Sequence, residues 1–118
     1  MNKILVVSSK ESERLLLEQM LDDFMHDGGE IFFANTPQQA LEVAEREKPK
    51  LVFVDETALG EKIELWQKLS GTVVLLTHHK KEYALTRVLI KPIQTQKIHQ
   101  LCEEVFGKRV SHPSLPPM

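Results

Sequence analysis

The chain has 118 residues, of which 42% are hydrophobic and 27% charged, and its formal net charge is −2. This length suits one compact domain and is too short for two. Acidic and basic residues are interspersed and no apolar run is long enough to cross a membrane, so we expect neither direct nucleic-acid binding nor membrane insertion. Cys102 has no partner for a disulfide and the amino terminus lacks an apolar signal region, which indicates a cytoplasmic protein.

The first part of the chain alternates between strand-like and helix-like patterns. An apolar run predicts a strand over residues 4–7. Ser8 and Glu11 have the spacing of a capping box, so we expect Ser8 to cap a helix. An apolar stripe then continues the helix until Gly28-Gly29 ends it. The stripe consists of Leu17, Met20, Leu21, Phe24 and Met25.

The next segment repeats the alternation with a clearer helix start. Residues 30–34 form a second apolar strand. Thr36 is a typical N-cap residue, Pro37 suits the first helical position, and Gln39 follows at the third. The pattern predicts a helix from Pro37 that ends before Pro49.

The central apolar run, residues 50–55, predicts a strand that is buried on both faces and that ends at Asp55. In open α/β sheets, ligands collect beyond the carboxyl ends of the strands, so Asp55 is the first candidate for function. The alternative is that Asp55 is a solvated turn residue or a helix cap.

The last part of the chain is less regular. Residues 61–69 carry apolar side chains at three-residue steps, including Trp66, which we interpret as a core anchor. Strands are expected at 72–76 and 87–90, and the segment 82–86 between them is too short for more than a turn or two of helix. A final amphipathic helix carries Ile98, Leu101, Cys102, Val105 and Phe106 on its apolar stripe.

Five strands alternating with helices predict a doubly wound α/β fold with a parallel five-stranded sheet. The carboxyl ends of these strands meet at one edge of the sheet, so the residues that follow them should cluster around one crevice. These residues are Ser8, Ser9, Asp55, Thr77 and Lys91.

The order of four short motifs, Lys-Ile-Leu-Val-Val, Val-Asp, Leu-Leu-Thr and Ile-Lys-Pro, resembles the CheY-like (flavodoxin-like) receiver domain of response regulators. The resemblance covers residues 2–106, which gives a receiver-like domain over 1–106 and a tail or linker over 107–118. It implies that Asp55 is the phosphoacceptor equivalent, while Thr77 and Lys91 are the phosphate-site equivalents. It also implies a cis bond between Lys91 and Pro92.

The chain departs from this family pattern in three ways. The family places two acidic residues after the first strand to hold Mg²⁺, and here those positions are Ser8 and Ser9, so we expect weak or absent Mg²⁺ binding and slow phosphotransfer. Asp55 and Thr77 are 22 positions apart, and Thr77 and Lys91 are 14 apart, which predicts a shortened fourth helix. Val88 stands at the switch position, where the family usually has an aromatic residue.

These departures favour a degenerate receiver, or pseudo-receiver, that acts by protein–protein interaction in two-component signalling and is not an enzyme. Its partner would be a signalling protein or its own output domain. A shortened fourth helix would expose the fourth and fifth strands and the last helix, which makes a homodimer possible. The alternative function is an enzyme of phosphotransfer or hydrolysis with Asp55 as its nucleophile.

Each candidate also has a purely structural interpretation. Ser8 and Ser9 are more typical of helix caps than of ligands, and Thr77 could simply finish a strand. Lys91 could be only a counter-ion for Asp55. With one carboxylate and one ammonium in the crevice, we expect Asp55 and Lys91 to form an ion pair that leaves little negative charge to recruit a cation. His78-His79 is interpreted as a surface pair, with no metal site.

Overall fold

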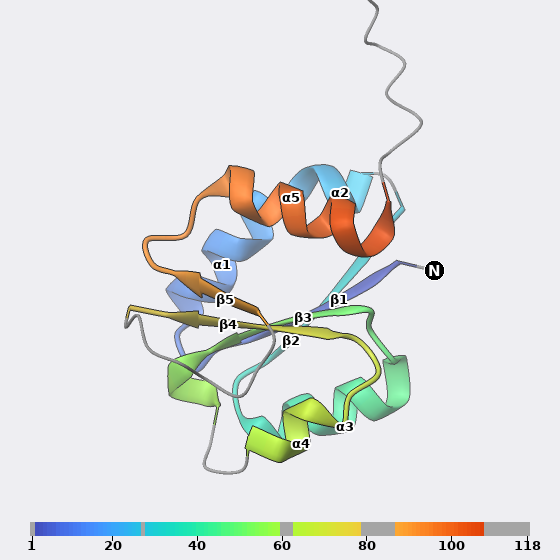
Figure 1. Cartoon of the computed structure of the whole chain (residues 1–118), viewed down its shortest axis with the longest axis vertical. Helices are drawn as coiled ribbons and strands as arrows, with labels where there is room; N and C mark the ends of the chain where they lie inside the picture. The colour runs from blue at the N-terminus through green and yellow to red at the C-terminus, as the bar shows by residue number, and fades with distance from the viewer. Residues whose placement is uncertain (1, 27, 60–62, 79–86, 108–118) are drawn as a thin grey trace, which may run out of the picture.

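The computed structural model describes residues 2–26, 28–59, 63–78 and 87–107. Five parallel strands form one sheet in the order β2-β1-β3-β4-β5. The expected parallel five-stranded sheet is therefore confirmed (Figure 1). The strands are β1 (Lys3–Val7), β2 (Glu30–Ala34), β3 (Leu51–Asp55), β4 (Thr72–Thr77) and β5 (Arg87–Ile90).

Helices cover both faces of this sheet. On one face lie α1, α2 and α5, and on the other lie α3 and α4 (Figure 1). The helices are α1 (Glu11–Met20), α2 (Asp22–His26), α3 (Pro37–Glu47), the 3-10 turn η1 (Glu56–Ala58), α4 (Ile63–Gln67) and α5 (Thr95–Phe106). This arrangement is the doubly wound architecture predicted from the alternation of strands and helices.

The central strands have hydrophobic side chains on both faces, and each face has its own core. Every residue of β3 is buried, as expected for an inner strand of a parallel sheet. Phe53 packs in the cluster beneath α1, α2 and α5 with Leu17 and Ile98. Trp66 lies in the opposite cluster with Ala40, and its indole N–H donates to the Leu59 carbonyl oxygen at 2.7 Å. The interpretation of Trp66 as a core anchor is confirmed.

The first helix differs from the prediction at both ends. It begins at Glu11, with Lys10 as its N-cap residue and no capping side chain, so the expected Ser8 cap is wrong. The backbone N–H of Ser8 still pairs with the Ala34 carbonyl oxygen, which holds Ser8 at the end of the sheet. The predicted single helix is interrupted at Leu21, although Leu21 itself is fully buried in the core. Met25 is 41% exposed on α2 and does not enter the core.

Helix α3 matches its prediction closely. The Thr36 side chain accepts a hydrogen bond from the Gln39 backbone N–H at 3.1 Å, and α3 begins at Pro37.

Gly28 has a φ of +89°, a backbone conformation that favours glycine, and it follows α2 where the sequence predicted the helix end.

The shortened fourth helix, expected between β4 and β5 within residues 79–86, lies outside the described residues. All of the expected tail over 107–118 except Gly107 lies outside them as well. Within the described ranges, no helix combines the length and apolar character that a membrane crossing requires.

Candidate functional site

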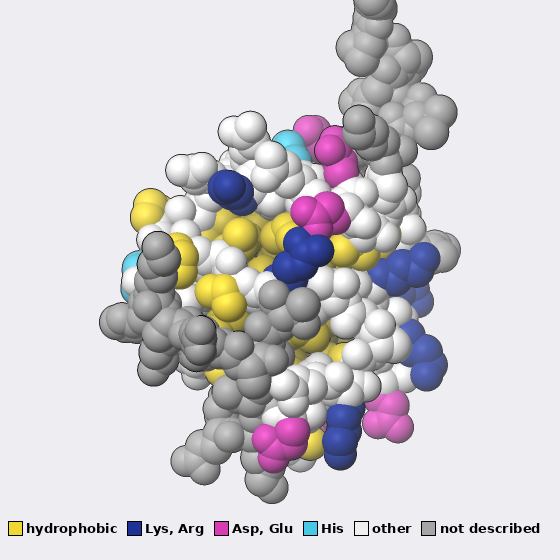
Figure 2. Space-filling model, viewed as in Figure 1, with side chains coloured by type: hydrophobic (Ala, Val, Ile, Leu, Met, Phe, Trp, Pro, Cys, Tyr) yellow, Lys and Arg dark blue, Asp and Glu magenta, His cyan; other side chains and the backbone are white. Residues whose placement is uncertain are grey.

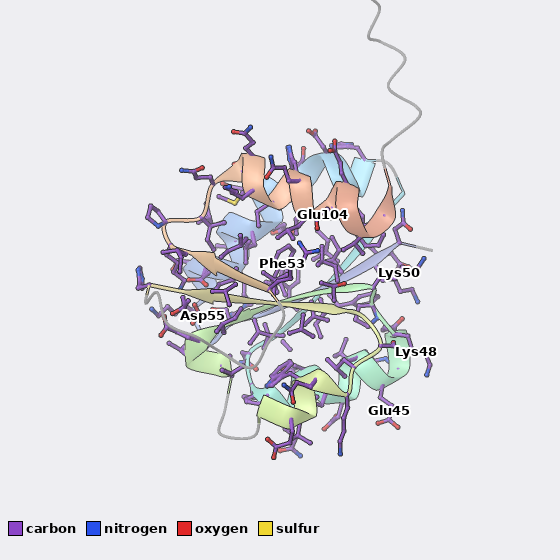
Figure 3. The ribbon with its side chains drawn as sticks, viewed as in Figure 1. Glu45, Lys48, Lys50, Phe53, Asp55 and Glu104 are labelled. Atoms are coloured by element: carbon purple, nitrogen blue, oxygen red, sulfur yellow. The ribbon has the colours of Figure 1, made fainter. Side chains whose placement is uncertain are left out.

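Four parallel strands bring the predicted site residues to the same edge of the sheet. Asp55 ends β3, Thr77 ends β4, and Ser8 and Lys91 follow β1 and β5 directly. The backbone N–H of Lys91 donates to the Thr77 carbonyl oxygen at 2.8 Å, so the β4–β5 pairing continues to the site. Ser8, Asp55 and Thr77 are fully buried. Figure 3 shows Asp55 at this end of β3, while Lys50 lies at the opposite end of the sheet.

Hydrogen bonds engage both carboxylate oxygens of Asp55. The Lys91 ammonium donates to Oδ1, which confirms the expected ion pair. The backbone N–H of Thr57 donates to Oδ2 at 3.0 Å, and the Thr57 hydroxyl donates to the same oxygen. Asp55 thereby also serves as the N-cap of η1. The Lys91–Pro92 peptide bond is cis, as predicted.

A second carboxylate, which the sequence analysis missed, contacts the same lysine. Glu13 Oε2 lies 2.8 Å from Lys91 Nζ, and the side chains of Lys91 and Glu13 are only 7% and 11% exposed. The predicted charge count of one carboxylate and one ammonium is therefore wrong. A signal was present in the sequence, because Glu13 precedes the buried Leu17 by four residues, and residues four apart share one face of a helix.

The three charged groups shift each other's pKa values. Burial would raise the pKa of Asp55, but the neighbouring Glu13, Lys91 and Thr57 side chains outweigh it and hold that pKa well below its usual range. The pKa of Glu13 is raised, by burial and then by the neighbouring Asp55. Burial opposes the charge on Lys91, yet its pKa is raised by hydrogen bonds to Asp55 and Glu13. Asp55 and Lys91 thus stay charged, and of the two carboxylates Glu13 is the one that holds a proton more readily.

A third carboxylate, that of Glu56 in η1, contacts the end of β4. Glu56 Oε2 accepts a hydrogen bond from the Thr77 hydroxyl at 2.8 Å and another from the backbone N–H of His78 at 2.9 Å. Thr77 therefore has a role beyond finishing the strand. His78 is exposed, as expected, and His79 lies outside the described residues.

Ser8 and Ser9 take part in local hydrogen bonds and do not cap α1. Ser8 Oγ accepts from the Lys10 backbone N–H at 3.1 Å, and the Ser8 carbonyl oxygen accepts from the Arg14 guanidinium at 2.5 Å. Ser9 Oγ lies 3.0 Å from Thr57 Oγ1. Ser8 and Ser9 thus link the end of β1 to α1 and to the turn after Asp55.

This set of donors and charges does not fit a Mg²⁺ ion. Mg²⁺ prefers carboxylate oxygens that are free to coordinate, together with several water molecules. Here the ammonium of Lys91 bridges Asp55 and Glu13, and neither serine is charged. The structure, over its described ranges, groups no three His, Cys, Asp or Glu side chains in a way that could hold a metal ion.

Two further residues lie where the sequence placed them. Val88, at the predicted switch position on β5, is half-buried against the cluster that contains Trp66. Cys102 on α5 is half-buried and packs against the other cluster, in agreement with its interpretation as a small core residue.

Solved structures resemble this chain closely in fold. No protein-family model matches the sequence, and no curated protein matches it. A two-component response regulator from Clostridium difficile superposes with a TM-score of 0.75 at 18% identity, covering 94% of this chain and 100% of its own. The receiver domain of a sensor histidine kinase from Pseudomonas aeruginosa, with a coordinated magnesium ion, gives 0.74 at 16% identity, covering 91% and 98%.

A chemotaxis response regulator of Vibrio cholerae gives a TM-score of 0.68 at 18% identity, with 89% of this chain and 98% of the other covered. Together with the strand order, these likenesses show that the chain has the CheY-like receiver fold. At such identities the likeness defines the fold alone, so the role of the chain has to be argued from its own residues.

Proposed function

We propose that this protein is an atypical receiver domain in two-component signalling, which transmits a signal by protein–protein interaction without phosphorylation of Asp55. The observation that carries the proposal is the state of the Asp55 carboxylate. It is fully buried, and each of its oxygens already accepts a hydrogen bond, from Lys91 or from Thr57. In this proposal Asp55, Thr77 and Lys91 keep the positions of a phosphorylation site but form a structural network.

The chemistry of phosphoryl transfer supports this interpretation. An attacking carboxylate needs a free lone pair in line with the leaving group, and the transferring group needs positive charge around its oxygens. Asp55 Oδ1 and Oδ2 are both engaged, and the Lys91 ammonium is shared between Asp55 and Glu13. Phosphorylation would have to break these contacts first.

Weak or absent Mg²⁺ binding belongs to the same proposal. The structurally similar Pseudomonas aeruginosa domain has a coordinated magnesium ion. In this chain Ser8 and Ser9 offer no charge, and the Ser8 carbonyl oxygen already accepts a hydrogen bond from Arg14. A cation approaching Asp55 would also meet the positive charge of Lys91.

An enzyme with Asp55 as nucleophile is not favoured, because it would need the same access and the same cation. We propose that output comes from docking to a signalling protein or to an output domain of the same chain, in the cytoplasm.

A homodimer through β4, β5 and α5 is a further part of the proposal. Ile90 on β5 is 43% exposed, and Figure 2 shows hydrophobic side chains at the surface over β5 and α5. Arg87 on β5 and Glu104 on α5 form an ion pair at 2.5 Å on this side of the protein, which adds charged groups around the apolar surface.

Amide spectra with beryllofluoride and Mg²⁺ test the proposal. Beryllofluoride mimics a phosphoryl group on an aspartate, so an ordinary site would respond with saturable shifts. We expect no saturable shift at residues 55–57 or 77–78, and the same spectrum for Asp55→Ala with and without the reagent. Saturable shifts that appear in the natural chain and vanish in Asp55→Ala would overturn the proposal.

A further inference from the structure

Two hydrogen-bond donors at the end of β4 converge on a single carboxylate oxygen. The Thr77 hydroxyl and the His78 backbone N–H both donate to Glu56 Oε2, at 2.8 and 2.9 Å. Thr77 is fully buried, and it is fixed as the last residue of β4. A hydroxyl and an N–H that point at one oxygen form a small anion-binding site, and hydrogen bonds to a charged acceptor are the stronger kind.

The anion in this site belongs to the chain itself. Glu56 directly follows Asp55 in the sequence, and Asp55 caps the short turn η1 that contains Glu56. The turn therefore fixes the direction in which the Glu56 side chain leaves the end of β3. The contact joins the end of β3 to the end of β4, two strands that are paired along their length.

We propose that the Glu56 carboxylate is a tethered anion: it fills the Thr77–His78 donor pair and so holds the end of β4 as a bound oxyanion would. The inference rests on the proposed function, since it explains how a receiver fold can keep one conformation at this edge without a phosphoryl group. It also concerns a different residue, Glu56, and a different pair of donors from those that engage Asp55.

Tethering explains why a free anion would not compete. A group held on a short link has an effective concentration on the order of millimolar or above at its own site. Inorganic phosphate or sulfate would have to exceed that level and would also meet the negative charge of Glu56. The natural chain should therefore ignore these ions, whereas removal of the Glu56 carboxylate should open the donor pair to them.

The test is a titration of inorganic phosphate, followed at the His78 amide by NMR. In Glu56→Ala, phosphate should shift the His78 amide saturably, with affinity at least about tenfold higher than in the natural chain. Sodium chloride at equal ionic strength controls for screening. Glu45→Ala, on the exposed side of α3 (Figure 3), is the matched loss of one glutamate and should behave as the natural chain does.

Glu56→Gln supplies a second measurement if Glu56→Ala does not fold. It keeps an acceptor oxygen but removes the charge, so the His78 amide proton should move upfield while distant amides stay unchanged. The inference is overturned if that proton does not move, if phosphate binds Glu56→Ala no better than the natural chain, or if chloride reproduces the effect. Failure of the proposed function would look different, because it would appear as a modified Asp55 in the natural chain.

Discussion

The ammonium of Lys91 lies 2.8 Å from the carboxylate of Glu13, although the two residues are 78 positions apart in the chain. The same ammonium also pairs with Asp55, so α1, β3 and the end of β5 meet at one buried cation. The network is internally satisfied except at Glu13 Oε1, which is buried and has no hydrogen-bond partner within the described part of the chain. Because this oxygen lacks a partner in that part of the chain, a substitution at Glu13 is the most informative test of the network.

Loss of the lysine should destabilise the fold. Lys91→Met leaves Asp55 and Glu13 buried beside each other without the Lys91 ammonium, and removal of one partner from a buried ion pair costs about 3–5 kcal/mol. Urea unfolding followed by the fluorescence of the buried Trp66 measures the change. Lys97→Met, at an exposed position of α5, is the matched control and should change stability by less than about 0.5 kcal/mol. Equal stability of Lys91→Met and the natural chain would show that the network contributes nothing.

Stability should depend on pH through Glu13. A carboxyl group whose pKa is raised by folding binds its proton more tightly in the folded state, so its contribution is complete below about pH 4.3 and is lost as pH rises through the raised pKa. Glu13→Gln cannot ionise, and its amide can donate to Asp55 and accept from Lys91. Its stability relative to the natural chain should therefore increase as pH rises above about 4.3, the ordinary pKa of a glutamate.

Unfolding free energies of the two proteins at several pH values check this expectation. Glu11→Gln, at an exposed position of the same helix turn, controls for the loss of one negative charge. A difference between Glu13→Gln and the natural chain that stays flat with pH would contradict the assignment of the titrating group to Glu13.

The Thr57 hydroxyl should contribute to holding Asp55. Thr57→Val keeps the backbone N–H that donates to Asp55 Oδ2 but removes the hydroxyl that donates to the same oxygen. Because the Thr57 side chain is exposed, we expect a loss of about 1 kcal/mol, below the range of about 1.5–3 kcal/mol that is typical of a bond to a charged group. Ser9→Ala, which removes only the contact with Thr57, should cost less in the same unfolding measurement. A larger loss of stability for Ser9→Ala than for Thr57→Val would argue against this role of Thr57.

New acidic residues after β1 should recruit a divalent cation. The double variant Ser8→Asp, Ser9→Asp adds two carboxylates next to Asp55 and Glu13, and carboxylate charge is what a Mg²⁺ site requires. We expect millimolar Mg²⁺ to raise the melting temperature of this variant and to leave that of the natural chain unchanged, both relative to sodium chloride. Ser12→Asp adds charge at an exposed position of α1 and serves as control. An equal Mg²⁺ effect on the natural chain would refute the expectation.

Sequence patterns were sufficient to predict the fold, because apolar periodicity and capping are local signals. Thr36, Pro37 and Gln39 define the start of α3 without help from the rest of the chain. The capping-box spacing of Ser8 and Glu11 was misleading, because the Ser8 backbone N–H is already bonded to Ala34 on the neighbouring strand. A tertiary contact of this kind leaves no mark in local spacing.

The site was predictable only in part, for a similar reason. Strand ends bring Asp55, Thr77 and Lys91 together, and this follows from topology alone. Glu13 and Glu56 reach the site from a helix and from a turn, so their places depend on the rotation of α1 about its axis and on the geometry of η1. Apart from the four-residue spacing between Glu13 and Leu17, no pattern in the sequence distinguishes these two carboxylates, yet they change the charge of the site.

The central claim is that the Asp55 carboxylate is not available for phosphorylation, and intact-protein mass spectrometry with acetyl phosphate and Mg²⁺ tests it most directly. An aspartyl phosphate adds one phosphoryl group to the mass of the chain, and Asp55→Asn shows whether any added mass belongs to Asp55. We predict that the natural chain keeps its unmodified mass. A phosphorylated species that forms readily in the natural chain and is absent in Asp55→Asn would contradict the account and return the protein to the ordinary receiver class.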